Sequence, residues 1–279
     1  MTIRHSAAAL ALCMLATLAR GQERVSFPSF DGAGNAPVVL SGYFFAASTS
    51  PAPAIAMFHG CGGAYDKDGQ LARRQREYAA LFNGLGLHVL VVDSLTARYE
   101  KELCTQRNAS RRVTQANRRL DALGAIAYLA DRADVDAKRI GLIGWSNGGS
   151  TVLSATNLHH RDVVAATPKP AFAIAFYPGC ESDLKRGYLP SAPLLMLVGE
   201  LDDWTPSAPC VALAASVSEA RPEIVAYGGA WHGFDSDAPV RVRKDVPNGV
   251  HPGQGVHVGG NPEAWRASRD RVVRFLAEH

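Results

Sequence analysis

A serine in a glycine-rich segment has the surroundings of an enzymatic nucleophile. The segment from Gly144 to Gly148 reads GWSNG; it follows the apolar run Arg139 to Ile143 and precedes the helix-compatible run Ser150 to Ala155. In the pattern G-x-S-x-G at a strand-to-helix turn, the glycines permit a sharp bend that lifts the serine above the sheet edge. The five-residue pattern is common by chance, so its position between a strand and a helix carries the prediction. We expect Ser146 to be a nucleophile.

A base and an acid follow Ser146 along the chain. A serine hydroxyl hardly ionises at neutral pH, so it needs a base within hydrogen-bond reach and a third group that orients the base. His232 comes after the predicted strand Glu223 to Tyr227, and Asp202 and Asp203 come after the predicted strand Leu194 to Gly199. The order serine, acid, histidine is that of α/β-hydrolases. We predict His232 as the base, with Asp202 or Asp203 as its partner.

The segment from His59 to Gly63, HGCGG, supplies the third requirement, donors for the oxyanion that forms when an ester carbonyl is attacked. It follows the predicted strand Ala54 to Phe58 and is similar to the H-G-G-G element of esterases. The expected donors are the backbone amides of Cys61 and of Asn147, which comes directly after the nucleophile. His59 is then a structural residue rather than a base.

These motifs need a scaffold that brings the ends of several strands to one edge. Short apolar runs alternate with helical patterns along the chain, which predicts a single α/β domain with a doubly wound, mostly parallel sheet flanked by helices. In such a sheet the functional loops lie at the carboxyl ends of the strands. The predicted strands are 38–45, 54–58, 88–92, 139–143, 171–177, 194–199 and 223–227, and the predicted helices are 71–85, 112–130, 150–155, 206–219 and 263–277.

Two connections bear on the size of the binding pocket. Between Tyr177 and Leu194 the residues Pro178, Gly179, Pro190 and Pro193 are expected to break any helix, so we predict a minimal lid and a small pocket open to water. The segment 235–262 is long for a connection in a compact domain. It either borders the pocket or forms a surface hairpin.

Length and composition fit an ordinary globular enzyme: 279 residues, 47% apolar and 20% charged. The formal net charge of +3 gives no argument for nucleic acid or membrane binding. Residues 1–21 read as a signal peptide, with Arg4 ahead of an apolar run from Ala7 to Leu18 that is shorter than the roughly 20 residues of a membrane span. We expect a domain at 22–279 in a periplasmic or secreted protein.

Four cysteines remain after the predicted signal peptide, and an even number in an exported protein favours disulfides. We prefer the pairs Cys61 with Cys104 and Cys180 with Cys210, because each pair joins loops that follow neighbouring strands. Free buried thiols are the alternative. No Cys-x-x-Cys pair or metal-ligand histidine spacing is present, so no metal site is predicted. The arginines 107, 111, 112, 118 and 119 are interpreted as a solvated helix face.

The sequence resembles the dienelactone hydrolase family of α/β-hydrolases, in an exported branch with a serine nucleophile. The resemblance covers essentially all of the mature chain. It is carried by the segments 59–63, 91–98 (VVDSLTAR), 144–149, 199–206 and 231–234. It implies hydrolysis through a covalent acyl-enzyme without a metal or an organic cofactor.

The sequence matches the family's site residues only in part. The family places the acid four residues before a proline, and Pro206 then points to Asp202. Members that act on dienelactone typically use a cysteine nucleophile, whereas this sequence has Ser146. They bind the substrate carboxylate with two arginines; Arg98 matches the first, but no arginine stands near 235–236, where the second falls.

Arg98, Trp145 and Trp231 are the expected substrate-binding residues. The predicted function is that of an exported serine hydrolase that cleaves a small-molecule ester or lactone of small acyl size. An acyltransferase or a peptidase would use the same triad, and the motifs are silent on that choice. A noncatalytic envelope binding protein is a third class, against which the intact triad argues.

Overall fold

The computed structural model describes residues 22–33 and 36–279, so the predicted signal peptide lies outside the described residues. An eight-stranded sheet runs through the domain in the order β1-β2-β4-β3-β5-β6-β7-β8. The strands are β1 (Glu23–Ala33), β2 (Ala36–Phe45), β3 (Ala52–Phe58), β4 (His88–Asp93), β5 (Val135–Trp145), β6 (Phe172–Phe176), β7 (Leu194–Gly199) and β8 (Glu223–Tyr227). β1, β2 and β4 pair antiparallel, and all other pairs in this sheet are parallel.

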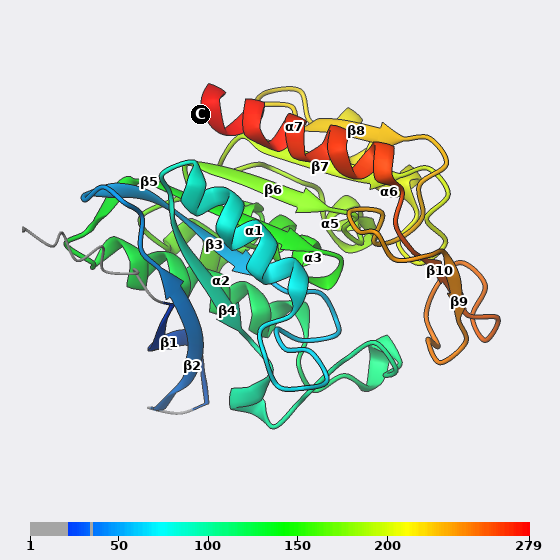
Figure 1. Ribbon diagram of the computed structural model, residues 1–279, viewed down its shortest axis with the longest axis horizontal. Helices are drawn as coiled ribbons and strands as arrows, with labels where there is room; N and C mark the ends of the chain where they lie inside the picture. The colour runs from blue at the N-terminus through cyan, green and yellow to red at the C-terminus, as the bar shows by residue number, and fades with distance from the viewer. Residues whose placement is uncertain (1–21, 34–35) are drawn as a thin grey trace, which may run out of the picture.

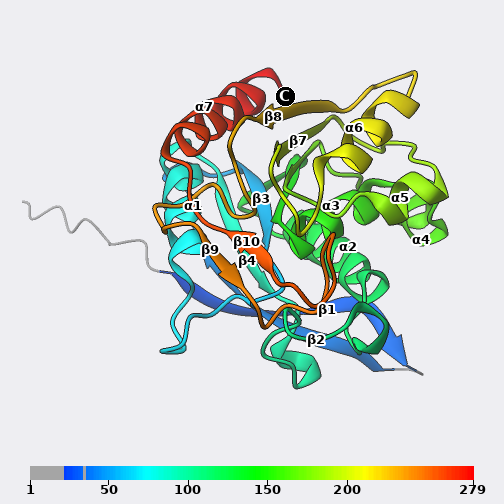
Figure 2. The same cartoon turned by 90° about the vertical axis from the view of Figure 1, so that its right-hand side faces the viewer.

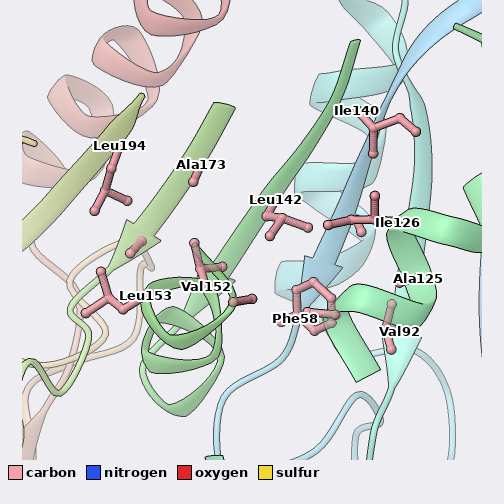
Figure 3. Close-up of a cluster of buried hydrophobic side chains, with 14 of the residues drawn as sticks. Phe58, Val92, Ala125, Ile126, Ile140, Leu142, Val152, Leu153, Ala173 and Leu194 are labelled. Atoms are coloured by element: carbon pink, nitrogen blue, oxygen red, sulfur yellow. The ribbon is translucent and has the colours of Figure 1, made fainter. Parts of the chain in front are cut away.

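Helices cover both faces of the sheet, as the alternating pattern predicts (Figure 1). The long helices are α1 (Arg73–Gly84), α2 (Gln115–Ala130), α3 (Asn147–Thr156), α6 (Ser207–Ser216) and α7 (Pro262–Glu278). Side chains of α2, α3 and α6 pack into one buried cluster, and those of α1 and α7 pack into the cluster on the opposite face. Figure 3 shows part of the first cluster, where Ile126 of α2 and Val152 of α3 lie against strand residues such as Leu142.

The strand β1 is an element that the sequence analysis missed. Its side chains alternate, with Val25, Phe27 and Ser29 buried between exposed neighbours. Pro28 lies within this strand, and proline normally argues against a strand because it cannot donate a ladder hydrogen bond. Within the described part of the chain, β1 is an edge strand that pairs with β2 alone, and it therefore tolerates Pro28.

A short helix, α5 (Glu181–Arg186), forms between β6 and β7, where the sequence analysis excluded any helix. The expectation is wrong because the breaking residues lie outside the helix. Pro178 and Gly179 precede it, and Gly187 ends it with a φ of 84°. A second short helix, α4 (Arg161–Ala165), follows α3.

Two disulfides tie loops together near the carboxyl edge of the sheet. One joins Cys61 to Cys104 and the other joins Cys180 to Cys210, which is the pairing preferred from the sequence. The segment 235–262 contains a hairpin of β9 (Arg241–Arg243) and β10 (Val256–Val258), which lies in front of this edge in Figure 2. Among the helices that the structure describes, none is long and apolar enough to cross a membrane.

Candidate active site

Ser146 sits at a tight turn between β5 and α3. Its backbone has φ 55° and ψ −118°, a strained conformation for a residue with a side chain, and its amide donates to Phe176 O at 2.9 Å. A Cβ atom on Gly144 would lie 2.1 Å from Gly148 O, and one on Gly148 would lie 2.0 Å from Phe58 O. Both glycines are therefore required, and the turn presents the serine hydroxyl at the carboxyl edge of the sheet.

Ser146, His232 and Asp202 form a continuous hydrogen-bonded chain. The distance from Ser146 Oγ to His232 Nε2 is 2.9 Å, and His232 Nδ1 lies 2.8 Å from Asp202 Oδ2. All three residues are buried. If Nδ1 carries the proton and donates to the carboxylate, Nε2 is free to accept from the hydroxyl. The arrangement can therefore activate Ser146 as a nucleophile.

Asp202 is held by its own loop. Its Oδ1 accepts the backbone amides of Trp204 at 2.9 Å and Thr205 at 2.8 Å, and its Oδ2 accepts the Thr205 hydroxyl at 3.1 Å. These bonds leave Oδ2 directed at His232. Asp203 faces elsewhere: its Oδ2 lies 2.7 Å from His257 Nδ1. Of the two aspartates left open by the residues alone, Asp202 is the one that contacts His232.

Two aromatic rings pack against the imidazole of His232, and a buried carboxylate holds one of them in place. The ring centroids of Tyr177 and Trp204 lie 4.6 and 4.7 Å from it. The Tyr177 hydroxyl donates to Asp235 Oδ1 at 2.6 Å, and Arg74 donates to both oxygens of Asp235 at 3.0 and 3.1 Å. The Asp235 side chain is fully buried. It therefore anchors the ring of Tyr177 that packs on the histidine.

Backbone amides of Cys61 and Asn147 lie where an oxyanion site is expected. Both residues line the cleft next to Ser146. Within 22–33 and 36–279, neither amide donates a hydrogen bond to another protein group. Behind them, Arg118 Nη2 donates to His59 O at 2.8 Å, and Nη1 donates to Asn147 Oδ1. The buried guanidinium thus links the two segments that carry the amides.

Arg118 corrects the interpretation of the basic cluster as a solvated helix face. Its side chain is completely buried, and burial lowers its pKa to about 10, so it remains charged at neutral pH. Arg119 is also mostly buried and binds Asp162 at 2.8 Å. Only Arg107 and Arg112 are exposed as expected. The interpretation failed because the loop before α2 and the helix α3 cover this part of α2. The hydrophobic period of α2 alone does not reveal these neighbours.

His59 is structural, as expected from its position in the HGCGG segment. It is fully buried, with Nδ1 2.7 Å from Gly60 O, and its Nε2 accepts the amide of Ser94 at 3.3 Å. Burial, together with the charge of Arg118, lowers its pKa to about 3. The imidazole is therefore neutral and fixes the loop beside the oxyanion site.

The cleft at Ser146 has a volume of about 850 Å³, which corrects the expectation of a small pocket. Its walls come from the loop before α2 and from α2, α3, α5, the Asp202 loop and the segment Asn248 to Val250. The long segment 235–262 therefore both borders the pocket and forms a hairpin. The cleft is larger than expected because α5 and this segment extend its walls.

The three expected substrate-binding residues do not line this cleft. The guanidinium of Arg98 is occupied by Asp31 and Asp121, both at 2.7 Å. Trp145 is buried and donates to Asp235 at 2.9 Å. The expectation for these two residues is wrong because each has partners within the fold.

Trp231 does not line the cleft either, and its ring stacks on His257 with centroids 4.2 Å apart. Trp204, which the sequence analysis did not single out, lines the cleft instead. Trp204 comes two residues after Asp202 in a loop that follows a strand, and this position could have indicated that it lies near the active site. Arg111, Ser150 and Ser154 also line the cleft, and no motif marks them.

The sheet, the serine turn and the hydrogen-bonded chain define the class of α/β-hydrolases. The fold is shared with solved structures of low sequence identity. Esterase 2 of Thermogutta terrifontis, in a structure phosphoramylated by tabun, superposes with a TM-score of 0.62 at 18% identity over 92% of this chain and 94% of that chain. A dienelactone hydrolase-like promiscuous phosphotriesterase from metagenomic libraries superposes with a TM-score of 0.65 at 17% identity. The match covers 92% of this chain and 98% of that chain.

The same fold occurs within a longer protein, dipeptidyl peptidase 4 of Porphyromonas gingivalis, at a TM-score of 0.62 and 15% identity, over 93% of this chain and 36% of that chain. No curated protein matches the sequence. The model of the dienelactone hydrolase family matches residues 40–279. The chain therefore belongs to the dienelactone hydrolase family and is a carboxylic ester hydrolase by class.

Proposed function

We propose that this protein is an exported serine hydrolase that cleaves a carboxylic ester or lactone of small acyl size. Ser146 is the nucleophile, His232 the general base and Asp202 the residue that orients the base. The observation that carries the proposal is the unbroken chain from Ser146 Oγ through His232 to Asp202, with distances of 2.9 and 2.8 Å, at the wall of an open cleft.

The first half of the reaction forms an acyl-enzyme. His232 Nε2 takes the proton as Ser146 Oγ attacks the ester carbonyl, and the amides of Cys61 and Asn147 donate to the oxygen that becomes negative. When the tetrahedral intermediate collapses, the ester C–O bond breaks. His232 then gives its proton to the departing alkoxide, which leaves as an alcohol. Asp202 stabilises the imidazolium throughout and keeps it correctly oriented.

The second half of the reaction releases the acid. Water in the cleft loses a proton to His232 and attacks the acyl carbonyl, and the same two amides again stabilise the oxyanion. Collapse breaks the bond to Ser146 Oγ, which regains a proton from His232. Hydrolysis rather than transfer is supported by a cleft that is open to water.

Export is supported by two observations. Residues 1–21 have the pattern of a signal peptide, and the disulfides Cys61–Cys104 and Cys180–Cys210 are of a kind that persists in oxidising compartments. We therefore assign the protein to the periplasm or the secreted fraction. Mass spectrometry of the protein recovered from a native periplasmic or culture fraction, without reduction, should give a chain that begins near residue 22.

Titration with an organophosphonate tests the function directly. A fold relative has been trapped with such an agent, and a reactive Ser146 should likewise form a stoichiometric adduct. We expect intact mass to show one adduct, mapped to Ser146, and parallel loss of 4-nitrophenyl acetate hydrolysis. The Ser146→Ala variant is the control and should show neither. A wild-type protein without adduct or turnover would point to a noncatalytic binding protein instead.

A further inference from the structure

The cleft has an arm that runs from Ser146 along one face of α3 and is lined with hydroxyl groups. Ser150 and Ser154 are four residues apart in α3, so their side chains lie on the same side of the helix, and Ser146 directly precedes this helix. At 1.5 Å per residue the three residues span roughly 12 Å. All three line the cleft. The arm therefore leads away from the reacting centre for more than the length of a small acyl group.

The far end of the arm is a cluster of polar side chains from three helical segments. Ser154 Oγ accepts Arg119 Nη1 at 3.0 Å and lies 3.4 Å from His160 Nε2. Asp183 of α5 accepts Asn157 Nδ2 at 2.8 Å through Oδ1. Arg119, Ser154, His160 and Asp183 all line the cleft. These largely buried groups thus hold one another in place at the wall of the cleft.

The charges in this arm largely offset one another. Arg119 is paired with Asp162 at 2.8 Å, and the walls carry Glu181 and Asp183 as well as Arg186. Burial, together with the charge of Arg119, lowers the pKa of His160 to about 4, so its ring is neutral at pH 7. An anionic group would meet Glu181 and Asp183 as well as Arg186, so a charged ligand gains little net attraction here.

The polar cluster also disfavours an apolar occupant at the far end of the arm, because a hydrocarbon chain there would cover Arg119, Ser154 and Asp183 without replacing their hydrogen bonds to water. Hydroxyl, guanidinium and carboxylate groups together offer both donors and acceptors. A neutral group that carries several hydroxyls can match both kinds at once, and a few well-placed polar contacts are what fixes the orientation of a bound ligand.

We propose that this arm is a subsite for a neutral, hydroxyl-rich group, so that the substrate is a short-chain ester of a carbohydrate. The inference rests on the proposed function, since Ser146 must hydrolyse the ester that the arm positions. The sugar lies along Ser150 and Ser154 with its far hydroxyls at Arg119 and Asp183, and the acyl group lies at Ser146.

Three acetyl esters of similar size test the proposal with the wild-type protein. Methyl 6-O-acetyl-glucopyranoside carries the hydroxyls, cyclohexylmethyl acetate lacks them, and 6-O-acetyl-gluconate adds a negative charge. Two hydrogen bonds made in the arm should raise kcat/KM for the glycoside about tenfold or more over the other two esters. Equal values, or a preference for the cyclohexyl or gluconate ester, would overturn the subsite.

Variants of residues in the arm test whether the preference for the glycoside arises there. Ser154→Ala and Asp183→Asn should each lower the ratio of kcat/KM for the glycoside to that for 4-nitrophenyl acetate about fivefold. Ser216→Ala is the matched control, because that hydroxyl donates to Leu213 O within α6, and its ratio should not change. An unchanged ratio in both arm variants contradicts the assignment.

Failure of the proposed function and failure of the subsite give different experimental results. If the wild-type protein does not hydrolyse 4-nitrophenyl acetate at all, the proposed function is wrong, and the carbohydrate ester falls with it. If it hydrolyses 4-nitrophenyl acetate but does not prefer the glycoside, only the subsite is wrong.

Discussion

Asp202 and Asp203 are adjacent in sequence, yet each binds a different histidine. Asp202 Oδ2 lies 2.8 Å from His232 Nδ1, and Asp203 Oδ2 lies 2.7 Å from His257 Nδ1. His257 belongs to β10, and the carbonyl of Asp203 also accepts the amide of Val250 at 2.8 Å. One loop therefore orients the proposed base with one residue and fastens a wall of the cleft with the next.

This division of roles predicts different kinetic effects for two neighbouring substitutions. Asp202→Asn should lower kcat about 10⁴-fold, because an amide can leave the imidazole in the wrong tautomer. The same substitution of the triad aspartate in a serine protease lowers kcat by about this factor. Asp203→Asn should change kcat far less and act mainly on KM through the 248–250 wall. Steady-state kinetics with 4-nitrophenyl acetate measure both. A larger loss of kcat in Asp203→Asn would reverse the assignment.

Substitutions of Ser146 and His232 should not be additive. Ser146→Ala and His232→Ala are each expected to remove most turnover, by about 10⁴-fold or more, because the members of a triad act as a unit. The double variant should then be little worse than either single variant. Circular dichroism should show an intact fold in all three. If the losses in kcat/KM multiply, the two residues do not cooperate and the assignment is wrong.

The buried His59 predicts a loss of stability in acid. Its pKa is lowered to about 3 in the folded protein, against 6.5 in an unfolded chain. Between these values the unfolded chain binds a proton that the folded protein does not, so the free energy of unfolding falls as the pH falls. The contribution is about 1.4 kcal/mol per pH unit and is absent above about pH 6.5.

Guanidinium unfolding of the wild type and of His59→Asn at several values between pH 7.5 and 4 tests this effect. The variant should be less stable at pH 7.5, because it loses the contacts to Gly60 and Ser94, but its stability should decline less steeply below pH 6.5. His160, whose pKa is lowered to about 4, contributes to the slope of both proteins and cancels in the comparison. Parallel pH profiles would show that His59 does not titrate in this way.

Much of the fold follows from local pattern. The strands 194–199 and 223–227 have the bounds expected from their apolar runs. Parallel strands place their carboxyl ends at one edge, so residues that follow three such strands had to come near one another. This is why the meeting of Ser146, Asp202 and His232 could be predicted without any knowledge of distances.

Contacts between distant segments could not be predicted in the same way. Arg98 was expected at the substrate because it matches the first of the two carboxylate-binding arginines of the family, but its partners Asp31 and Asp121 come from β1 and α2. Arg74 and Asp235 are 161 residues apart, and no local pattern marks either as a partner of the other. The hydrophobic period and the spacing of motifs predict the helix or strand to which a residue belongs. They do not predict which distant segment packs against that residue.

The disulfide at the proposed oxyanion site should affect both stability and catalysis. Cys61 is bonded to Cys104, and Cys61 O accepts the amide of Leu103 at 2.7 Å. The double variant Cys61→Ala/Cys104→Ala should lose about 4 kcal/mol of stability on the chain-entropy model. Its kcat should fall about tenfold, less than the 10²–10³ for complete loss of one oxyanion donor.

The second disulfide provides the control for this prediction. Cys180→Ala/Cys210→Ala should lose a similar free energy of unfolding, because the closed loop is of similar length, but should show a smaller fall in kcat. Denaturant unfolding and kinetics at a temperature where both variants are folded separate the two effects. Equal losses of kcat would mean that the Cys61 disulfide acts only through global stability.

The polar far end of the cleft predicts a preference for short acyl chains. Each buried methylene is worth about 0.8 kcal/mol when it leaves water for an apolar surface, and a long chain that reached Arg119, Ser154 and Asp183 would meet polar groups instead. The connection between β6 and β7 carries only the six-residue helix α5 in place of a long lid. Among 4-nitrophenyl esters from acetate to palmitate, kcat/KM should therefore be highest for about two to four acyl carbons, without activation at lipid droplets. A maximum at the long end, or a jump in rate above the solubility limit, would mean that the segment Asn248 to Val250 moves as a lid and opens an apolar surface.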